Sequence, residues 1–237
     1  KIKVFVKLKV GIFSTGNELI DHNSRKKKFC IYDSNKLVLI SLFKKLSCDV
    51  HDLGIIQDNI FEAKEKIIKN ANKFELIVTS GGISSSEQDK ISDLLNRHGE
   101  IKFWRLAIKP GRPIAYGKIN NTPFIGLPGN PVAAVITFFM ILSEYIKKIS
   151  GIKVNNLHER KLPSSFQMKK KIGRTEWLRG SIKLINNKQY IDKFKTSGSG
   201  IISSITNSDG IIEIDENVSK ITKGTLLKFY KFEDFLN

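Results

Sequence analysis

The 237-residue sequence predicts an α/β fold: a three-layer, doubly wound, mostly parallel sheet, followed by a small all-β, barrel-like domain. Up to Gly151, short apolar runs alternate with stretches of helical periodicity, which is typical of a parallel sheet with helices on both faces. Beyond Gly151, only short runs separated by turn residues follow, which favours an all-β unit. We therefore expect two domains, at residues 1–151 and 152–237.

The expected elements of the first domain follow from its apolar pattern. Apolar runs that end in turn residues predict buried strands, and apolar residues three or four apart predict helices. The expected strands are residues 9–14, 50–56 and 76–79, and the expected helices are residues 32–46, 61–72 and 88–97. Asp33, Ser34 and Asn35 can cap the first of these helices. Because parallel strands end at one edge of a sheet, we expect a ligand there.

The chain then continues through more apolar runs and one well-specified helix start. The runs are residues 101–108, 114–119 and 123–127, with a turn at residues 109–113. Asn130 can serve as the N-cap, and Pro131 as the first residue, of a long apolar helix that ends near Gly151. The runs expected in the all-β domain are residues 178–185, 190–194, 210–214 and 225–232.

Composition and charge narrow the possible functions. Hydrophobic residues make up 41% of the chain, which is enough for a core, and the formal net charge is +17. Such a charge attracts nucleic acid, phosphates and other anions. The excess is spread over both predicted domains, however, and Lys greatly outnumbers Arg, which makes the bidentate contacts to phosphates and bases. We expect no nucleic-acid partner, whereas a small anionic substrate remains plausible.

Cysteine content and hydropathy point to a cytoplasmic protein with no membrane partner. Cys30 and Cys48 have a spacing that matches no metal-ligand pattern, and a secreted protein of this size usually carries more cysteines. No apolar run approaches the roughly 18 residues that a membrane span needs. The chain starts at Lys1 without a signal-like segment, so we expect that upstream domains are missing.

Three carboxylates follow predicted strands. Glu18, Asp58 and Asp89 come after the first, second and third strands, so they are expected at one edge of the sheet. Mg²⁺ binds one or two carboxylates and completes its shell with phosphate oxygens and water. The three residues therefore indicate a magnesium site beside a phosphorylated ligand. The alternative is that each is a helix cap or a solvated loop carboxylate.

Three loops could bind anions. Residues 79–86 contain Gly81 and Gly82, which permit close approach of a ligand to the backbone, but the loop is neither a P-loop nor a GxGxxG fingerprint. In residues 109–113, two prolines stiffen a turn that presents Lys109 and Arg112, a suitable clamp for a tetrahedral oxyanion. The third loop is residues 126–131. The alternatives are a common glycine turn, a charged surface turn and a helix start without a ligand.

Together, these motifs resemble the molybdopterin molybdenumtransferase family, which includes a bacterial enzyme and the E domain of gephyrin. In the α/β domain the resemblance rests on residues 13–19, 31–35, 53–58, 80–84, 109–113 and 126–131. Residues 173–180 and 197–204 resemble the C-terminal β domain of the family. The resemblance covers nearly the whole chain, but only the C-terminal half of a family member.

The resemblance implies the insertion of molybdate into adenylylated molybdopterin, with Mg²⁺-dependent release of AMP. It implies Asp58 and Asp89 as metal ligands, and a catalytic set of these two with Glu18, which matches an acidic position near the pterin nucleotide. The implied substrate-binding residues are Gly81, Gly82, Ser84, Lys109, Arg112, Pro113, Gly129, Asn130, Arg174 and Ser199. Among these, Lys109, Arg112 and Pro113 resemble the turn that lines the molybdate site, to which the β domain contributes Arg174 and Ser199.

The sequence departs from the family pattern at four positions. Arg112 replaces a common lysine and Ala133 a common serine, while Ser86 and Ser197 replace a glycine and a glutamine. For the full-length protein, the resemblance further implies a homodimer and possible contact with the adenylyltransferase that makes the substrate. Two alternatives stay open: that adenylyltransferase itself, which shares the α/β fold, and a noncatalytic molybdopterin-binding scaffold.

Overall fold

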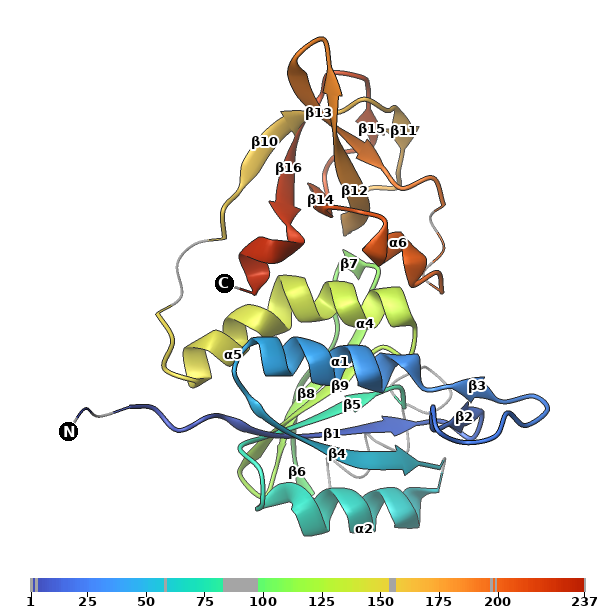
Figure 1. Cartoon of the computed structure of the whole chain (residues 1–237), viewed down its shortest axis with the longest axis vertical. Helices are drawn as coiled ribbons and strands as arrows, with labels where there is room; N and C mark the ends of the chain where they lie inside the picture. The colour runs from blue at the N-terminus through green and yellow to red at the C-terminus, as the bar shows by residue number, and fades with distance from the viewer. Residues whose placement is uncertain are drawn as a thin grey trace.

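The computed structural model describes residues 2, 4–57, 59–82, 98–153, 157–196, 198 and 200–236; for Ile60 and residues 101–104 it describes the backbone only. A six-stranded sheet, ordered β4-β1-β5-β9-β8-β6, forms the first part of the chain, here called the α/β part (Figure 1). Its strands are β1 (Lys9–Thr15), β4 (Asp49–Ile56), β5 (Leu76–Ser80), β6 (Gly99–Arg105), β8 (Pro113–Ile119) and β9 (Thr122–Leu127).

The sheet is mostly parallel, as predicted. β1 pairs in parallel with β4 and β5, and β5 pairs in parallel with β9. At one edge of the sheet, β8 pairs antiparallel with β9, and β6 pairs antiparallel with β8. The reason for the reversal is local, because Asn120 and Asn121 have φ of 47° and 74° and form a two-residue hairpin between β8 and β9. The carboxyl ends of β1, β5 and β9 therefore meet at one edge of the sheet.

Helices cover both faces of this sheet (Figure 1). α1 (Ser34–Lys45), α4 (Pro131–Thr137) and α5 (Ser143–Ile149) lie on one face, and α2 (Ile60–Ala71) lies on the other. A π-helical turn, η1 (Phe138–Leu142), joins α4 to α5, so the expected long helix is continuous. Strand side chains alternate between the faces: Val10 and Ile12 pack toward α1 and α4, and Phe13 packs in the cluster that includes α2. This confirms the doubly wound, three-layer fold.

The first helix begins later than predicted, and one expected helix is not described. Tyr32 belongs to β3 (Ile31–Tyr32), which pairs with β2 (Leu19–Ile20), so α1 begins at Ser34. Asp33 is its N-cap and accepts a hydrogen bond from the Lys36 amide at 3.1 Å. The helix expected at residues 88–97 lies outside the described residues.

The second part, here called the β part, is an open sheet ordered β10-β16-β14-β12-β13. Between its two edges a single isolated bridge forms, from Ser164, just after β10, to Ile191 of β13. The strand order stays open, so the described residues form no closed barrel. The strands of this part are β10 (Arg160–Pro163), β11 (Met168–Lys169), β12 (Thr175–Ile185), β13 (Lys188–Lys193), β14 (Gly210–Ile214), β15 (Lys220–Ile221) and β16 (Leu226–Lys231). The short helices are α6 (Ser203–Thr206) and the 3-10 helix η2 (Phe232–Phe235).

The two parts are joined by backbone pairing and by a shared core. β7 (Ile108–Lys109), from the α/β part, adds to the β sheet in parallel with β12. Phe139 of η1 packs against Phe232 and Phe235, with ring centroids 5.1 and 5.2 Å apart. The strands β7, β10, β11 and β15 are not predicted from the sequence, because strands of two to four residues are too short to show a periodicity of their own. Over the described part of the chain, we find no helix with the length and apolar character to cross a membrane.

Candidate functional site

A cavity of about 600 Å³ lies where the two parts meet. We call it the cationic cavity. Its walls come from residues 108–113, from the start of α4 and from the β part. The residues that line it are Ile108, Lys109, Pro110, Gly111, Arg112, Pro113, Pro128, Asn130, Ala133, Met168, Lys169, Arg174, Glu176, Trp177, Leu178, Arg179, Lys193, Phe194 and Thr196.

The pairing of β7 with β12 builds the wall between the two parts. Thr175 donates its amide hydrogen to the carbonyl of Ala107 at 3.0 Å, and Glu176 stands in register with Lys109. The Lys109 ammonium then lies 3.2 Å from Glu176 Oε1. Glu176 is buried, with 5% of its surface exposed, whereas the Lys109 side chain is 56% exposed. A buried carboxylate of the β part therefore holds a lysine of the α/β part at the cavity wall.

The charges that line the cavity are almost all positive. Glu176 is the one carboxylate among the described lining residues, against six basic ones: Lys109, Arg112, Lys169, Arg174, Arg179 and Lys193. In the part of the chain that the structure describes, no carboxylate forms an ion pair with Arg112 or Arg174. These two guanidinium groups can therefore take a bidentate anion, such as a tetrahedral oxyanion.

Arg179, which also lines the cavity, adds a buried positive charge. It is 3% exposed, and its guanidinium donates hydrogen bonds to Ser204 Oγ at 3.0 Å and to the carbonyls of Thr196 and Gly198 at 3.2 Å each. Burial lowers the pKa of Arg179 below its ordinary value. Its acceptors among the described residues are neutral, so the positive charge strengthens the attraction of the cavity for anions.

Close backbone approach defines a second region, here called the glycine-loop edge, around Gly81, Gly82 and Gly129. Gly81 and Gly82 have φ of 88° and 70°, and an added Cβ on Gly81 would lie 2.7 Å from the carbonyl oxygen of Thr15. A Cβ on Gly129 would contact the Gly81 Cα at 3.4 Å. The end of β1 and the loops after β5 and β9 therefore pack backbone against backbone, and at Gly81 a side chain would clash with the Thr15 carbonyl.

Buried hydroxyl groups at these strand ends lack partners. Ser14 Oγ, Thr15 Oγ1 and Thr79 Oγ1 are buried and have no hydrogen-bond partner among the described residues. Buried polar groups are normally hydrogen-bonded, so unpaired ones beside a loop suit contact with a polar ligand. The glycine-loop edge thus has the chemistry for a phosphate or hydroxyl-bearing ligand, next to the cationic cavity.

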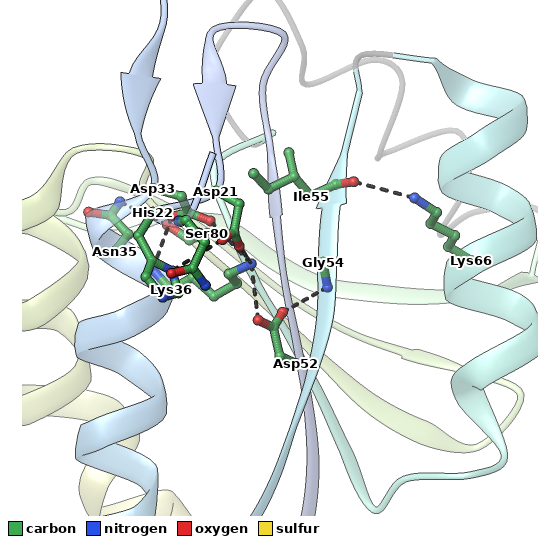
Figure 2. Close-up of polar contacts among 11 residues, drawn as sticks. Asp21, His22, Asp33, Asn35, Lys36, Asp52, Gly54, Ile55, Lys66 and Ser80 are labelled. Carbon is green, nitrogen blue, oxygen red and sulfur yellow. Dashed lines mark hydrogen bonds and ion pairs between the residues drawn. The ribbon is translucent and has the colours of Figure 1, made fainter. Parts of the chain in front are cut away.

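Figure 2 shows how the start of α1 is fixed at this edge. Asn35 Nδ2 donates to Ser80 Oγ and to the Gly129 carbonyl, both at 2.8 Å. The ammonium of Lys36, whose side chain is 2% exposed, lies 3.1 Å from Asp52, 3.5 Å from Asp21 and 4.0 Å from Asp33. Lys36 therefore ties α1 to β4 and to the segment that follows β2.

The structure brings together only some of the predicted site residues. Lys109, Arg112, Pro113, Asn130 and Arg174 line one cavity, although they come from three separate segments of the chain. Asn130 occupies the N-cap position of α4 as predicted, but its side chain makes no capping hydrogen bond.

Other predicted residues lie elsewhere or are not described. Gly81, Gly82 and Gly129 form the glycine-loop edge, and exposed Glu18 lies close to Gly16, where an added Cβ would be 2.6 Å from Glu18 Oε2. Glu18 is not among the residues that line the cavity. Asp58, Ser84, Asp89 and Ser199 lie outside the described residues. The convergence of two acidic side chains with the cationic turn therefore stays a prediction.

The described residues contain no large cluster of metal-binding side chains. No group of three His, Cys, Asp or Glu side chains among them could hold a metal ion. The carboxylates of Asp21, Asp33 and Asp52 surround the Lys36 ammonium, which already supplies their positive charge. The magnesium-binding role of Asp58 and Asp89 stays a prediction, because both residues lie outside the described residues.

Sequence reasoning assigned no role to three residues that shape these sites. Glu176 and Arg179 fall within a motif that the resemblance used, and Asn35 was assigned to helix capping only. A usable signal was the presence of charged residues within the first half of a strand whose neighbours are buried. Such charges need partners, and here the partners are Lys109 and the segment around Thr196 and Gly198.

The fold and the two sites define an α/β protein with a cationic cavity beside the edge where its parallel strands end, against a second, β-rich part. Residues 11–148 match the family model described as "Probable molybdopterin binding domain", and residues 161–232 match that of the "MoeA C-terminal region (domain IV)". The first match covers more than half of the chain, so the chain belongs to this molybdopterin-binding family. The family predicted from the sequence motifs is thereby confirmed.

Individual proteins agree with this assignment. The molybdopterin molybdenumtransferase of Haemophilus influenzae is 33% identical over 243 residues, covering 100% of this chain and 59% of that protein. Gephyrin of Dictyostelium discoideum is 30% identical over 62% of this chain and 24% of its own length. The crystal structure of a molybdopterin biosynthesis MoeA protein from Pyrococcus horikosii superposes with a TM-score of 0.81 and 26% identity, covering 95% of this chain and 55% of that one. The chain thus spans little more than half the length of the Haemophilus influenzae and Pyrococcus horikosii proteins.

Proposed function

We propose that this chain has the molybdate-inserting activity of a molybdopterin molybdenumtransferase, or that it is the C-terminal half of an enzyme with that activity. The proposed reaction inserts molybdate into adenylylated molybdopterin and releases AMP in a Mg²⁺-dependent step. The observation that carries the proposal is the cationic cavity of about 600 Å³, which is lined by Lys109 and Arg112 of the α/β part together with Arg174 of the β part. Relatives named for this activity support it.

The proposed mechanism relies on binding and orientation by the cavity residues. Arg112 and Arg174 hold the molybdate dianion by charge-assisted hydrogen bonds, and Lys109 contributes a third cation whose position Glu176 fixes. Preorganised cations in a partly enclosed cavity stabilise anionic charge without reorganising during the reaction. Placing the oxyanion against the pterin thiols then supplies much of the rate by proximity.

The glycine-loop edge is proposed to bind the nucleotide end of the substrate. The side-chain-free backbone around Gly81 and Gly82, together with the unpaired hydroxyls of Thr15 and Thr79, suits phosphate oxygens or ribose hydroxyls. When bound, Mg²⁺ would polarise the pyrophosphate linkage and neutralise charge on the AMP that leaves, and Asp58 and Asp89 are its proposed ligands. Glu18 is proposed to act near the pterin nucleotide, and Ser84 and Ser199 complete the proposed substrate contacts.

The remaining proposals concern the whole protein. They are a domain division at residues 151–152, which falls between the two matched segments, a homodimer in the full-length protein, contact with the adenylyltransferase, and cytoplasmic localisation. At one departure from the family pattern, Ala133 places a methyl group in the cavity lining, where relatives commonly carry a serine hydroxyl. The molybdate contacts proposed here therefore rest on the cationic side chains and not on residue 133.

The test is an AMP-release assay on the purified chain, with adenylylated molybdopterin, Mg²⁺ and varied molybdate. We predict molybdate-dependent AMP release, which Arg112→Ala lowers roughly 10- to 100-fold at low molybdate because a charged hydrogen bond is lost. Arg25→Ala, an exposed loop substitution outside the cavity lining, serves as the matched control and should retain the wild-type rate.

Two results would contradict the proposal. One is AMP release that is independent of molybdate or unaffected by Arg112→Ala. The other is formation of adenylylated pterin when the chain is given ATP and molybdopterin, which would identify it as the adenylyltransferase.

A further inference from the structure

The side chain of Asn35 connects three elements. Asn35 is the second residue of α1, and its amide nitrogen donates to Ser80 Oγ and to the Gly129 carbonyl, each at 2.8 Å (Figure 2). Ser80 ends β5, and Gly129 lies in the loop between β9 and α4. One half-buried amide group thus reaches from a helix to two loops that lie 45 and 94 residues away in sequence.

Both hydrogen bonds of Asn35 reach the glycine-loop edge, and the bond to Gly129 lies where this edge borders the cationic cavity. Ser80 directly precedes Gly81 at the glycine-loop edge, whereas Gly129 directly precedes Asn130, which lines the cationic cavity with Pro128. The loops also contact each other, because the Gly81 amide donates to the Leu127 carbonyl at 3.0 Å. The hydrogen bonds that Asn35 donates therefore lie at the boundary between the two sites.

Asn35 is held in place by its neighbours on both sides. Asp33 caps the helix by accepting a hydrogen bond from the Lys36 amide, and the buried Lys36 ammonium pairs with Asp52 of β4 at 3.1 Å. These contacts fix the first turn of α1 against the sheet, so the Asn35 amide is presented in one position. A side chain supported in this way is preorganised, and it can transmit order between the groups that it bonds.

We propose that Asn35 is a positioning residue that couples the glycine-loop edge to the cationic cavity, so that a nucleoside monophosphate and a tetrahedral oxyanion bind cooperatively. The inference rests on the proposed function, which places these two ligands at the two sites. A ligand that favours one position of the Gly81 segment also favours one position of the Gly129 loop through Asn35, so the second ligand then meets a loop that is already in place. By linkage, each ligand raises the affinity for the other by the same factor.

The experiment measures that factor with AMP and molybdate as probes. Molybdate is titrated calorimetrically into the chain in Mg²⁺ buffer, with and without saturating AMP. We predict that AMP raises the molybdate affinity of the wild-type chain about tenfold, a typical coupling. Asn35→Ala and Asn35→Asp, which both remove the amide donor, should reduce the factor to about two or less. Ser80→Ala removes one of the two acceptors and should give an intermediate factor.

A matched control separates coupling from general stability. Asn70→Ala also removes a side-chain amide, which donates to the Lys66 carbonyl within α2, away from both loops, and it should keep the wild-type factor. Thermal unfolding of each variant checks that the fold is intact, and Ala at the second position of a helix does not disfavour helix formation.

The outcomes distinguish the two proposals. Both ligands binding to the wild-type chain with a factor that Asn35→Ala leaves unchanged would overturn the role of Asn35 while leaving the proposed function standing. Independent binding of the two ligands to the wild-type chain would overturn it as well. A wild-type chain that binds neither AMP nor molybdate would contradict the proposed function itself, and the coupling with it.

Discussion

At the scale of single residues, the buried charges show how the sites are held. Lys36 and Asp33 are each 2% exposed in their side chains, and Asp21 and Asp52 complete the group around the ammonium. Removing one partner of a buried pair leaves the other charge without compensation in a poorly solvated place. Lys36 is therefore expected to matter for stability, although the sequence shows it only as one of many lysines.

We predict that Lys36→Met destabilises the protein by about 3 kcal/mol, because the buried Asp33 carboxylate loses its nearest cation. Urea unfolding at neutral pH measures the change in the free energy of unfolding. Lys69→Met is the control, because the Lys69–Glu65 pair is 71% and 69% exposed and should contribute less than about 0.5 kcal/mol. Equal effects of the two substitutions would show that the cluster around Lys36 does not stabilise the fold.

The sequence predicts only part of the candidate site, and the residues that it does not predict show why. Lys109 and Arg112 could be chosen from sequence because two prolines stiffen the turn that carries them. Glu176 could not, since its role depends on the register between β7 and β12, which joins segments 67 residues apart. Pairing between short strands that are distant in sequence depends on tertiary structure, and the local apolar periodicity does not indicate it.

At the scale of elements, turns were the most predictable feature. Asn186 and Asn187 have φ of 49° and 59° and join β12 to β13 by a two-residue hairpin, as their residue types indicate. The expected run at residues 210–214 coincides with β14. The boundaries of α1 were harder to predict, because the extended conformation of Tyr32 comes from pairing with β2, far from the helix pattern itself.

The same hairpin gives a pH-dependent contribution to stability. Partial burial would raise the pKa of Asp192, but hydrogen bonds from Lys183 and Ser165 outweigh it, and the pKa lies below its ordinary value of 3.8. A carboxyl group whose folded-state pKa is lowered stabilises the fold above its unfolded pKa, near 3.9, and this contribution is lost as the pH falls through the folded pKa.

We predict that Asp192→Asn lowers the free energy of unfolding by less than about 1 kcal/mol at pH 7, since Lys183 is largely exposed. The difference from wild type should shrink as the pH falls below 3.8 and vanish once Asp192 is protonated in both states. Urea unfolding across that range measures it. A difference that stays constant down to pH 2 would contradict the assigned pKa direction.

At the scale of the whole molecule, the cavity exists because two parts of the chain share a sheet and a core. β7 extends the β sheet from the α/β part, and Phe139 packs on Phe232 and Phe235 across the junction. The arginines and lysines of both parts then face one space, with Glu176 the one acidic side chain among its described lining residues. The net charge of +17 adds a field that draws small anions toward it.

The most direct test of this account is anomalous diffraction from crystals of the chain soaked in sodium tungstate, a heavy tetrahedral dianion with the shape of molybdate. We predict a tungsten site in the cationic cavity, within hydrogen-bonding reach of Arg112 and Arg174, which is lost in the Arg112→Ala variant. Tungsten bound only outside the cavity, or bound equally in wild type and variant, would contradict the assignment of this cavity as the oxyanion site.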